Sequence, residues 1–216
     1  MYRLFVKRII DIIISSLLIV VLSPTYIIIA LAVFLSMGHP VMYRQERIGK
    51  NETTFVMAKF RTMTNKRDSD GNLLPETQRI TSTGRILRSC SLDEIPELFS
   101  ILKGDMSFVG PRPMPTYYKP FFLPEERKRH MVRGGLIPPD SLSGKAYTTY
   151  EEQFQYECEY VDNISFSLDC KVIQKTIKIL IDRVKTDYGA GFERPHLNIY
   201  RADMINEKKD RNEGTY

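Results

Sequence analysis

The chain has 216 residues, 43% of them hydrophobic and 26% charged, a balance that allows a buried core and excludes an intrinsically disordered protein. Its formal net charge of +5 favours anionic partners, namely phosphates, acidic lipids or nucleic acid, without choosing among them. The three cysteines and three histidines form neither a disulfide framework nor a pair with zinc-ligand spacing, so reduced thiols are expected and a zinc site is not.

The first predicted element is an apolar run over residues 9–37, interrupted by Ser23-Pro24. Proline removes an amide donor and clashes with the preceding turn, so a helix break is expected at this dipeptide. Each arm would reach only ~20 Å, whereas the hydrocarbon core of a bilayer is ~30 Å thick. A cleaved signal peptide is not expected, because the run is too long and no small-residue cleavage site follows it.

Basic residues flank this run on both sides. They are Arg3, Lys7 and Arg8 before it and Arg44, Arg47 and Lys50 after it. The positive-inside rule would keep both flanks cytoplasmic. A re-entrant helix, which turns at Ser23-Pro24 and leaves on the face where it entered, accounts for the break, the short arms and both flanks. A single span kinked at the proline stays open as an equal alternative, because membrane helices tolerate proline.

The next segments predict short extended chain followed by a loop. Residues 38–64 contain turn signals at Gly38-His39-Pro40 and Gly49-Lys50-Asn51. After the second of them, the stretch 53–63 is rich in β-forming residues with partial alternation, so a strand is expected there. Residues 65–78 are polar and include Asp-Gly, which predicts a loop.

Helical patterns dominate the remainder of the chain. One helix is expected after Pro96, ending at Gly104, and another start is expected at Pro124. Residues 168–185 predict an amphipathic helix, whose apolar stripe is interpreted as a core face, with a membrane-surface role as the second reading. Residues 191–216 are polar and are expected to form a loose tail.

Two adjacent carboxylates, Asp93 and Glu94, are the first candidates for chemistry. One interpretation is a capping box, in which Ser91 caps a helix and Glu94 reciprocates. Pro96 weakens it, because its missing amide could not bond to Leu92. The proline fits better in the donor-free first turn of a helix that begins near Asp93. Two acids that merely cap a helix stay an open alternative on this local pattern.

Basic residues in the surrounding sequence suggest a phosphate site. The candidates for contacts to substrate phosphates are Lys59, Arg61, Arg79, Arg88 and Arg112. Arginine binds phosphate oxygens in a bidentate manner. A carboxylate that attacks phosphorus also needs cations, commonly Mg²⁺, to neutralise the developing charge. One acid could then be the nucleophile, and the other a metal ligand or a proton-transfer group.

Taken together, these motifs resemble the bacterial sugar transferases of the monotopic phosphoglycosyl transferase family. The matching elements are the apolar run with Ser23-Pro24, KFRTM at 59–63, RITSTGRILR at 79–88, SLDEIPEL at 91–98, LKGDMSFVGPRP at 102–113 and YVDNISFSLDCKV at 160–172. The chain departs from the family pattern at 133–138 and 142–145, loops expected to line the nucleotide or sugar pocket, and at Glu97, where the family often has Gln.

The resemblance implies an α/β fold, of the helix-rich α+β kind, at the cytoplasmic face of the bacterial inner membrane. Residues 1–37 would form the re-entrant membrane helix, broken at Ser23-Pro24. Residues 38–190 would form the membrane-surface catalytic domain, and residues 191–216 the tail.

The resemblance also implies a reaction: transfer of a sugar-1-phosphate from a UDP-sugar to undecaprenyl phosphate, with release of UMP. Asp93 would carry the phosphosugar covalently and bind Mg²⁺, and Glu94 would support proton transfer or orientation. The expected partners are the donor, the lipid acceptor and membrane phospholipids, with a homodimer left open. Two alternatives are a membrane-associated nucleotide-sugar pyrophosphatase and a non-enzymatic basic membrane-surface protein. No nucleic acid is expected, because no nucleic-acid motif is visible.

Overall fold

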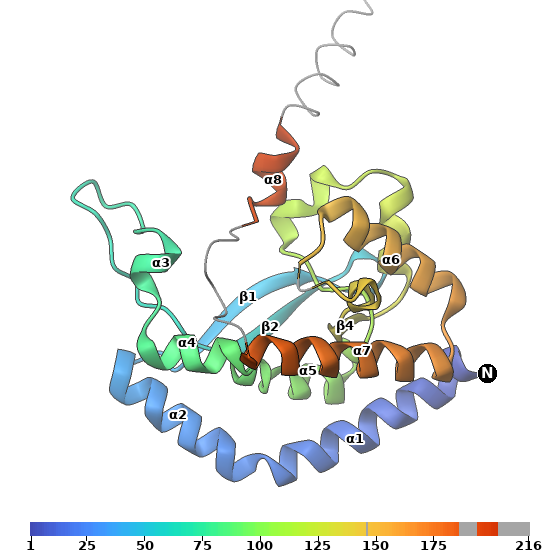
Figure 1. Cartoon of the computed structure of the whole chain (residues 1–216), viewed down its shortest axis with the longest axis horizontal. Helices are drawn as coiled ribbons and strands as arrows, with labels where there is room; N and C mark the ends of the chain where they lie inside the picture. Colours follow the sequence, from blue (N-terminus) through green and yellow to red (C-terminus); the bar gives the residue numbers. More distant parts are fainter. Residues whose placement is uncertain (146, 186–193, 203–216) are drawn as a thin grey trace, which may run out of the picture.

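The structure is a computed structural model, which describes residues 1–145, 147–185 and 194–202. It begins with a π-helical turn, Tyr2–Val6, that leads into α1 (Lys7–Val21) and α2 (Ser23–Met37). Figure 1 shows α1 and α2 as a bent pair that lies beneath the rest of the molecule.

The bend between the two helices is 62° and follows directly from the local sequence. Pro24 occupies the first turn of α2, where its missing amide donor costs nothing. The Ser23 hydroxyl donates to the Val20 carbonyl over 2.8 Å, which satisfies an acceptor at the end of α1. The predicted helix break at Ser23-Pro24 is confirmed. By length and composition, no single helix in the described residues could cross a bilayer, whereas this one bent pair could.

Two small sheets sit above the helix pair. The strands β1 (Met42–Ile48) and β2 (Thr54–Phe60) form an antiparallel hairpin, with Tyr43 opposite Lys59. This confirms the strand expected within 53–63. The strands β3 (Met106–Val109) and β4 (Gly134–Ile137) pair in parallel in a second sheet of two strands.

Helices and 3-10 turns surround the two sheets and make the fold helix-rich. They are α3 (Glu76–Arg79), α4 (Ser82–Ser89), η3 (Leu92–Glu94), α5 (Glu97–Lys103), η4 (Thr116–Phe121), η5 (Glu125–Met131), η6 (Pro139–Ser143), α6 (Tyr150–Asn163), α7 (Phe166–Lys185) and α8 (Leu197–Tyr200). The short turn η2 (Lys50–Glu52) closes the β1–β2 hairpin, as the turn signal there predicted. The amphipathic helix expected at 168–185 is confirmed as α7.

Two of the longer helices, α4 and α6, were not anticipated, although each carries a local signal. The Thr81 side chain caps α4 by accepting from the Gly84 amide, and Thr149 with Glu152 forms a complete capping box at the start of α6. The helix start expected at Pro124 is found, but as the 3-10 segment η5. The loop expected at 65–78 holds up to Pro75, after which α3 begins.

The start of the expected tail is packed, which corrects the prediction of a loose segment there. Leu197 is fully buried in the core cluster that also contains Tyr150 and Phe154. Arg201 is only 3% exposed, and its guanidinium donates to both oxygens of Glu126 over 2.7 Å. The polar composition of this segment did not predict its packing, because the packing depends on a single arginine–carboxylate pair and one leucine. Residues 191–193 and 203–216 of the expected tail lie outside the described residues.

The α1–α2 pair is tied to the body by the polar residues of α1. The Asp11 side chain is only 3% exposed and accepts a hydrogen bond from the Phe108 amide over 3.1 Å. Arg8 donates to the Ile101 and Leu102 carbonyls at the end of α5 over 2.6 and 2.8 Å, and Lys7 lies 2.5 Å from a carboxylate oxygen of Asp169 on α7. These basic residues therefore anchor α1 to the body. The sequence analysis interpreted them only as charges that flank the apolar run.

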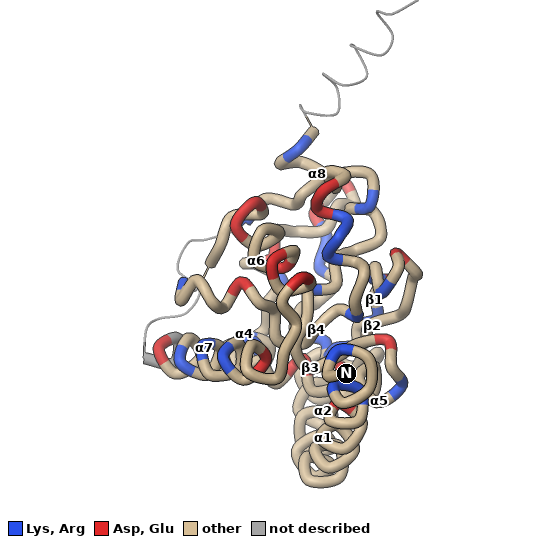
Figure 2. The backbone as a smooth tube through the Cα atoms, turned by 90° about the vertical axis from the view of Figure 1, so that its right-hand side faces the viewer, with Lys and Arg blue, Asp and Glu red and all other residues tan. Residues whose placement is uncertain are grey.

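The opposite side of the pair is apolar and exposed. Between Asp11 and Arg44 the sequence contains no Lys, Arg, Asp or Glu. Figure 2 shows charged residues around the body, while the part of α1 and α2 farthest from it carries none. The large exposed side chains on these helices include Ile13, Leu17, Val20, Val21, Ile27, Ile28, Leu31 and Leu35. An apolar surface of this extent marks an interaction with a membrane or another apolar partner.

Candidate active site

The backbone around Asp93 and Glu94 is a tight reversal between two helices. After α4 ends, Ser91 adopts a left-handed conformation with φ 55° and ψ 22°. Residues 92–94 then form the 3-10 turn η3, and α5 begins only at Glu97, after Pro96 as its N-cap. The helix start expected near Asp93 is therefore displaced by four residues. The Ser91 side chain makes no capping bond, so no capping box is formed at this point.

Glu94 is held by two cations from distant parts of the chain. Lys59 on β2 donates to its carboxylate over 2.5 Å, and Arg112, on the turn after β3, donates to the same oxygen over 3.3 Å. Burial raises the pKa of Glu94, but Arg112 and Lys59 outweigh it and hold the pKa below its usual value. Glu94 is thus ionised and firmly oriented.

Asp93 differs from its neighbour in having no such partner. It is 9% exposed, and no hydrogen bond or ion pair from another side chain reaches it within the part of the chain that the structure describes. Burial raises its pKa, and the charge of Glu94 raises it further, against the opposing effects of Lys59 and Arg88. Adjacent carboxylates with opposite pKa shifts are typical of sites where two acids have different roles.

A third carboxylate, Glu97, belongs to the same cluster. It is 3% exposed at the start of α5, and one of its oxygens lies 3.1 Å from the Lys59 ammonium without hydrogen-bond geometry. Burial raises the pKa of Glu97 to about 7, Glu94 adds to the rise, and Lys59 with Arg112 opposes it. Sequence reasoning recorded Glu97 only as a departure from a motif and did not include it in the site.

The predicted phosphate-binding cations divide into two groups. Lys59 and Arg112 contact Glu94, and the charge of Arg88 acts on Asp93, while its guanidinium donates to the Thr62 hydroxyl over 3.1 Å. These three therefore surround the pair Asp93 and Glu94, hereafter the dyad.

Arg61 and Arg79 have a different role in the structure. Arg61 donates to the carbonyls of Met63 and Pro40, each over 3.1 Å, and Arg79 donates to the Leu74 carbonyl over 2.7 Å. These bonds stabilise the loops around β2 and α3. No contact between either arginine and the dyad is found in the described residues.

A buried ion pair between η5 and α6 positions the turn that carries Arg112. Glu157 and Arg129 both have fully buried side chains, and Arg129 donates to Glu157 over 2.6 Å. The other Glu157 oxygen accepts from the Arg112 amide over 2.8 Å, and Arg129 also donates to the Arg112 carbonyl over 2.7 Å. The Arg112 backbone is thus held from both sides. No sequence motif pointed to this pair, whose members lie 28 residues apart.

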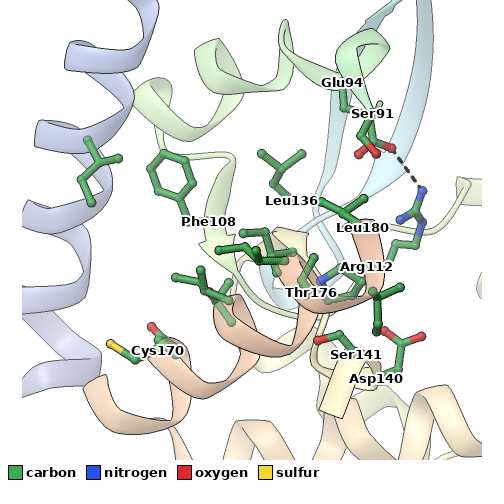
Figure 3. A pocket seen from close by; sticks show the side chains of 18 of the residues that line it. Ser91, Glu94, Phe108, Arg112, Leu136, Asp140, Ser141, Cys170, Thr176 and Leu180 are labelled. Atoms are coloured by element: carbon green, nitrogen blue, oxygen red, sulfur yellow. Dashed lines mark hydrogen bonds and ion pairs between the residues drawn. The ribbon is translucent and has the colours of Figure 1, made fainter. Parts of the chain in front are cut away.

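Glu94, but not Asp93, lines a cavity of about 860 Å³. Figure 3 shows Ser91, Glu94 and Arg112 at one end of it, with Phe108 and Leu136 between α1 and α7. The helix break lies close by, because Leu22 lines this cavity together with Ile95, and Ser23 lines a smaller pocket that also contains Ile95. The site therefore joins a charged end to an apolar interior.

The carboxylates at this site could supply only a small number of protein ligands to a metal ion. In the described residues, no group of three or more His, Cys, Asp or Glu side chains could hold a metal ion. Mg²⁺ commonly needs just one or two protein carboxylates, because substrate phosphates and water complete its coordination shell. Asp93, which has no cation bonded to it, meets this smaller requirement together with phosphate oxygens of a substrate.

Comparison with known proteins agrees with the resemblance of the motifs. The model of the bacterial sugar transferase family matches residues 2–183. The chain is 39% identical over 179 residues to the uncharacterized sugar transferase EpsL of Bacillus subtilis (strain 168), covering 82% of this chain and 89% of the relative.

Two further relatives have named activities. The chain is 32% identical over 187 residues to the UDP-glucose:undecaprenyl-phosphate glucose-1-phosphate transferase of Caulobacter vibrioides, covering 81% of this chain and 69% of the relative. It is 35% identical over 182 residues to the protein of the same name in Klebsiella pneumoniae, covering 79% of this chain but 39% of that longer relative. The chain belongs to the bacterial sugar transferase family and is a phosphoglycosyl transferase.

Proposed function

We propose that the protein transfers a sugar-1-phosphate from a UDP-sugar to undecaprenyl phosphate and releases UMP. The observation that carries this proposal is the arrangement of Asp93. Its buried carboxylate has no bonded side-chain partner in the described residues, stands among cations, and lies beside an ion-paired Glu94 that lines one end of the cavity. The names of the Caulobacter and Klebsiella relatives support the same donor class and acceptor.

The reaction would proceed in two displacements at one phosphorus atom. An Asp93 oxygen attacks the phosphorus that bears the sugar, and the bond from that phosphorus to the UMP oxygen breaks, so UMP leaves with the bonding electrons. An oxygen of the lipid phosphate then attacks the same phosphorus, and the bond to Asp93 breaks, which restores the carboxylate. A covalent intermediate lets one small site process two bulky substrates in succession.

The neighbouring residues would prepare this carboxylate for attack. Lys59, Arg88 and Arg112 supply positive charge where two phosphates and a carboxylate must approach each other. Glu94 keeps Lys59 and Arg112 oriented. Mg²⁺, held by Asp93 together with substrate phosphate oxygens, would add positive charge to the transferring phosphoryl group.

The membrane segment would be re-entrant, with the catalytic part on the cytoplasmic face of the inner membrane. Two contacts support this over a spanning helix. The beginning of α1 is tied to the body by Arg8 and Lys7, and the end of α2 packs through the fully buried Val33 against Phe60 and Leu87. Both ends of the bent pair thus return to the same body, and the exposed apolar residues lie between them (Figure 1).

A mass and product assay tests the reaction. The purified protein is incubated with a panel of UDP-sugars, with and without undecaprenyl phosphate, while released UMP and the intact protein mass are recorded. With the correct donor alone, we expect an adduct of one phosphosugar on wild-type protein and none on Asp93→Asn. Continuous UMP release without the lipid would indicate a pyrophosphatase instead. Absence of any adduct on residue 93 with a donor that is turned over would refute the covalent route.

A further inference from the structure

The helices α1 and α7 are joined at one end and separate toward the other. At the joined end the Tyr2 and Phe166 rings lie 6.0 Å apart, and both Tyr2 and Lys7 bond to a carboxylate oxygen of Asp169, each over 2.5 Å. Toward the dyad, the 860 Å³ cavity described above lies between the two helices. This arrangement gives a groove with one closed end.

Two apolar stripes face each other across this groove. On α1 and its C-cap the apolar lining residues are Ile10, Ile14, Leu18 and Leu22, which follow each other at intervals of four and therefore form one ridge. Lys7 and Asp11 of α1 also line the cavity. That ridge is ~18 Å long at ~1.5 Å per residue. On α7 the lining includes Ile173, Ile177 and Leu180, again at helical spacing.

The α7 stripe is not buried as a core face would be. Val172, which points into the core, has no exposed surface, whereas Ile177 is 52% exposed. Figure 3 shows Leu180 and Thr176 of α7 directed toward the space that also holds Phe108 and Leu136. An apolar channel between two helices, left open by the protein's own side chains, fits an elongated apolar ligand.

Charged residues line both ends of the groove: Lys7 and Asp169 pair with each other at the closed end, and a second set lies at the open end. Arg112 and Glu94 line it there, together with Arg194 and Lys145. One guanidinium nitrogen of Arg194 is buried and has no hydrogen-bond partner among the described residues. A ligand that matches both parts has a long apolar chain and an anionic head. A nucleotide sugar, which is polar throughout, does not match the apolar part.

We propose that this groove holds the isoprenoid chain of the acceptor between α1 and α7, with the acceptor phosphate directed to Arg112 beside the dyad. The inference rests on the proposed function and adds to it the site of the lipid chain. The outer side of α1 is exposed and apolar, so a lipid could move from the bilayer into the groove beside this helix without crossing a polar surface.

A matched pair of variants on α7 tests the groove. Ile177 lines it and is 52% exposed, whereas Ile181, one turn further on, is 51% exposed and is not among the lining residues. Ile177→Trp should fill the groove, and Ile181→Trp should place the same bulk outside it. Ile14→Trp approaches the groove from the opposite wall and provides a second, independent obstruction.

Two measurements are made on the full chain in detergent micelles. The first is the KM for undecaprenyl phosphate, with UMP release in a single turnover without lipid as the donor-side control. The second is binding of undecaprenyl phosphate by native mass spectrometry, in competition with phosphatidic acid. We expect Ile177→Trp and Ile14→Trp to weaken binding and raise KM about tenfold, with donor-side UMP release unchanged and Ile181→Trp like wild type.

The possible outcomes distinguish a failure of the groove assignment from a failure of the proposed reaction. Unchanged binding and KM in both groove variants would overturn the inference, and so would an equal loss in Ile181→Trp, which would indicate a general apolar surface. Displacement of undecaprenyl phosphate by equimolar phosphatidic acid would overturn the assignment to the isoprenoid acceptor. If wild-type protein turned over no UDP-sugar, the proposed function would fail, while the binding measurement would still decide where the lipid chain lies.

Discussion

Two of the buried clusters of carboxylates and cations, one around α6 and one around Asp93 and Glu94, differ in how completely their charges are paired. Around α6, Glu157 bonds to Arg129, to the Arg112 amide and to Gln153, and every one of these bonds is 2.9 Å or shorter. Around the dyad, Glu94 and Glu97 share Lys59, and Asp93 has no bonded side-chain partner in the described residues.

This difference in charge pairing distinguishes a cluster that stabilises the fold from a cluster that is suited to catalysis. A buried charge is costly unless it is paired and hydrogen-bonded. The α6 cluster meets this condition and holds the Arg112 turn in place. The dyad cluster contains three acids for two bonded cations, so the pKa values of Asp93 and Glu97 are raised, first of all by burial. In the proposed reaction, an incoming phosphate with its counter-ion would complete this second cluster, whereas the first has no unsatisfied carboxylate.

The largest effect is expected from Asp93→Asn, which removes the proposed nucleophile and leaves the α6 cluster intact. Turnover should fall by at least about 10³-fold, because loss of a covalent nucleophile abolishes both displacements. Thermal unfolding should stay within a few degrees of wild type, since no bonded partner of Asp93 loses its contact. UMP release and a melting curve on the same preparation measure both. A large loss of stability would mean that Asp93 supports the fold instead.

Glu157→Gln should have the opposite primary effect, because it should lower the stability of the fold. The variant leaves the Arg129 guanidinium buried without its charge partner, which destabilises proteins by about 3 kcal/mol or more. Urea unfolding in detergent measures the loss. Activity should fall as well, since the Arg112 turn loses its anchor. Glu159→Gln, on the exposed side of the same helix, serves as the control and should leave both unchanged.

Glu97→Gln should change how stability depends on pH. The pKa of Glu97 is raised in the folded protein to about 7, from an ordinary value of 4.5. The folded state therefore holds an extra proton between these values, and its contribution to stability is present below pH 4.5 and lost as the pH rises through about 7. Wild-type protein should lose on the order of 2 kcal/mol between pH 5 and pH 8 from this group.

The variant lacks the titrating carboxyl and should show a smaller loss over the same range. Urea unfolding of wild type and variant at both pH values provides the comparison. Identical pH dependence in the two proteins would mean that Glu97 does not titrate in this window.

Arg112→Lys should produce a smaller, catalytic effect. Lysine keeps the charge but offers a single ammonium in place of the planar fork that contacts Glu94 over 3.3 Å. Turnover should fall about tenfold, which corresponds to about 1.4 kcal/mol. The kcat and KM for the UDP-sugar separate positioning from binding. Full activity in this variant would show that charge alone is required at this position.

The smallest effect is expected from Arg79→Gln. Its guanidinium donates to the Leu74 carbonyl, and no contact with the dyad is found in the described residues. Activity should change less than about twofold, as is usual for substitutions outside a site. The KM for the UDP-sugar measures this directly. A tenfold rise would return Arg79 to the set of phosphate-binding residues that the sequence suggested.

The sequence by itself determined the features that depend on local chemistry. The break at Ser23-Pro24 follows from a missing amide donor, β2 from its β-forming residues, and α7 from the spacing of its apolar residues. It also singled out Asp93 and Glu94, because adjacent acids beside a proline are visible in one stretch. The caps of α4 and α6 are equally local, so the sequence around Thr81 and Thr149 also predicts these two helix starts.

Only the tertiary structure decided which cations reach the dyad and which acids share them. Lys59 and Glu94 are 35 residues apart, and the Arg129–Glu157 pair is 28 apart, so neither contact has a sequence signature. Glu97 is buried beside Lys59, and this burial raises its pKa. Leu197 is also buried, although the segment around it is polar. Such properties arise when distant segments exclude water together, and no window of sequence contains all the participants.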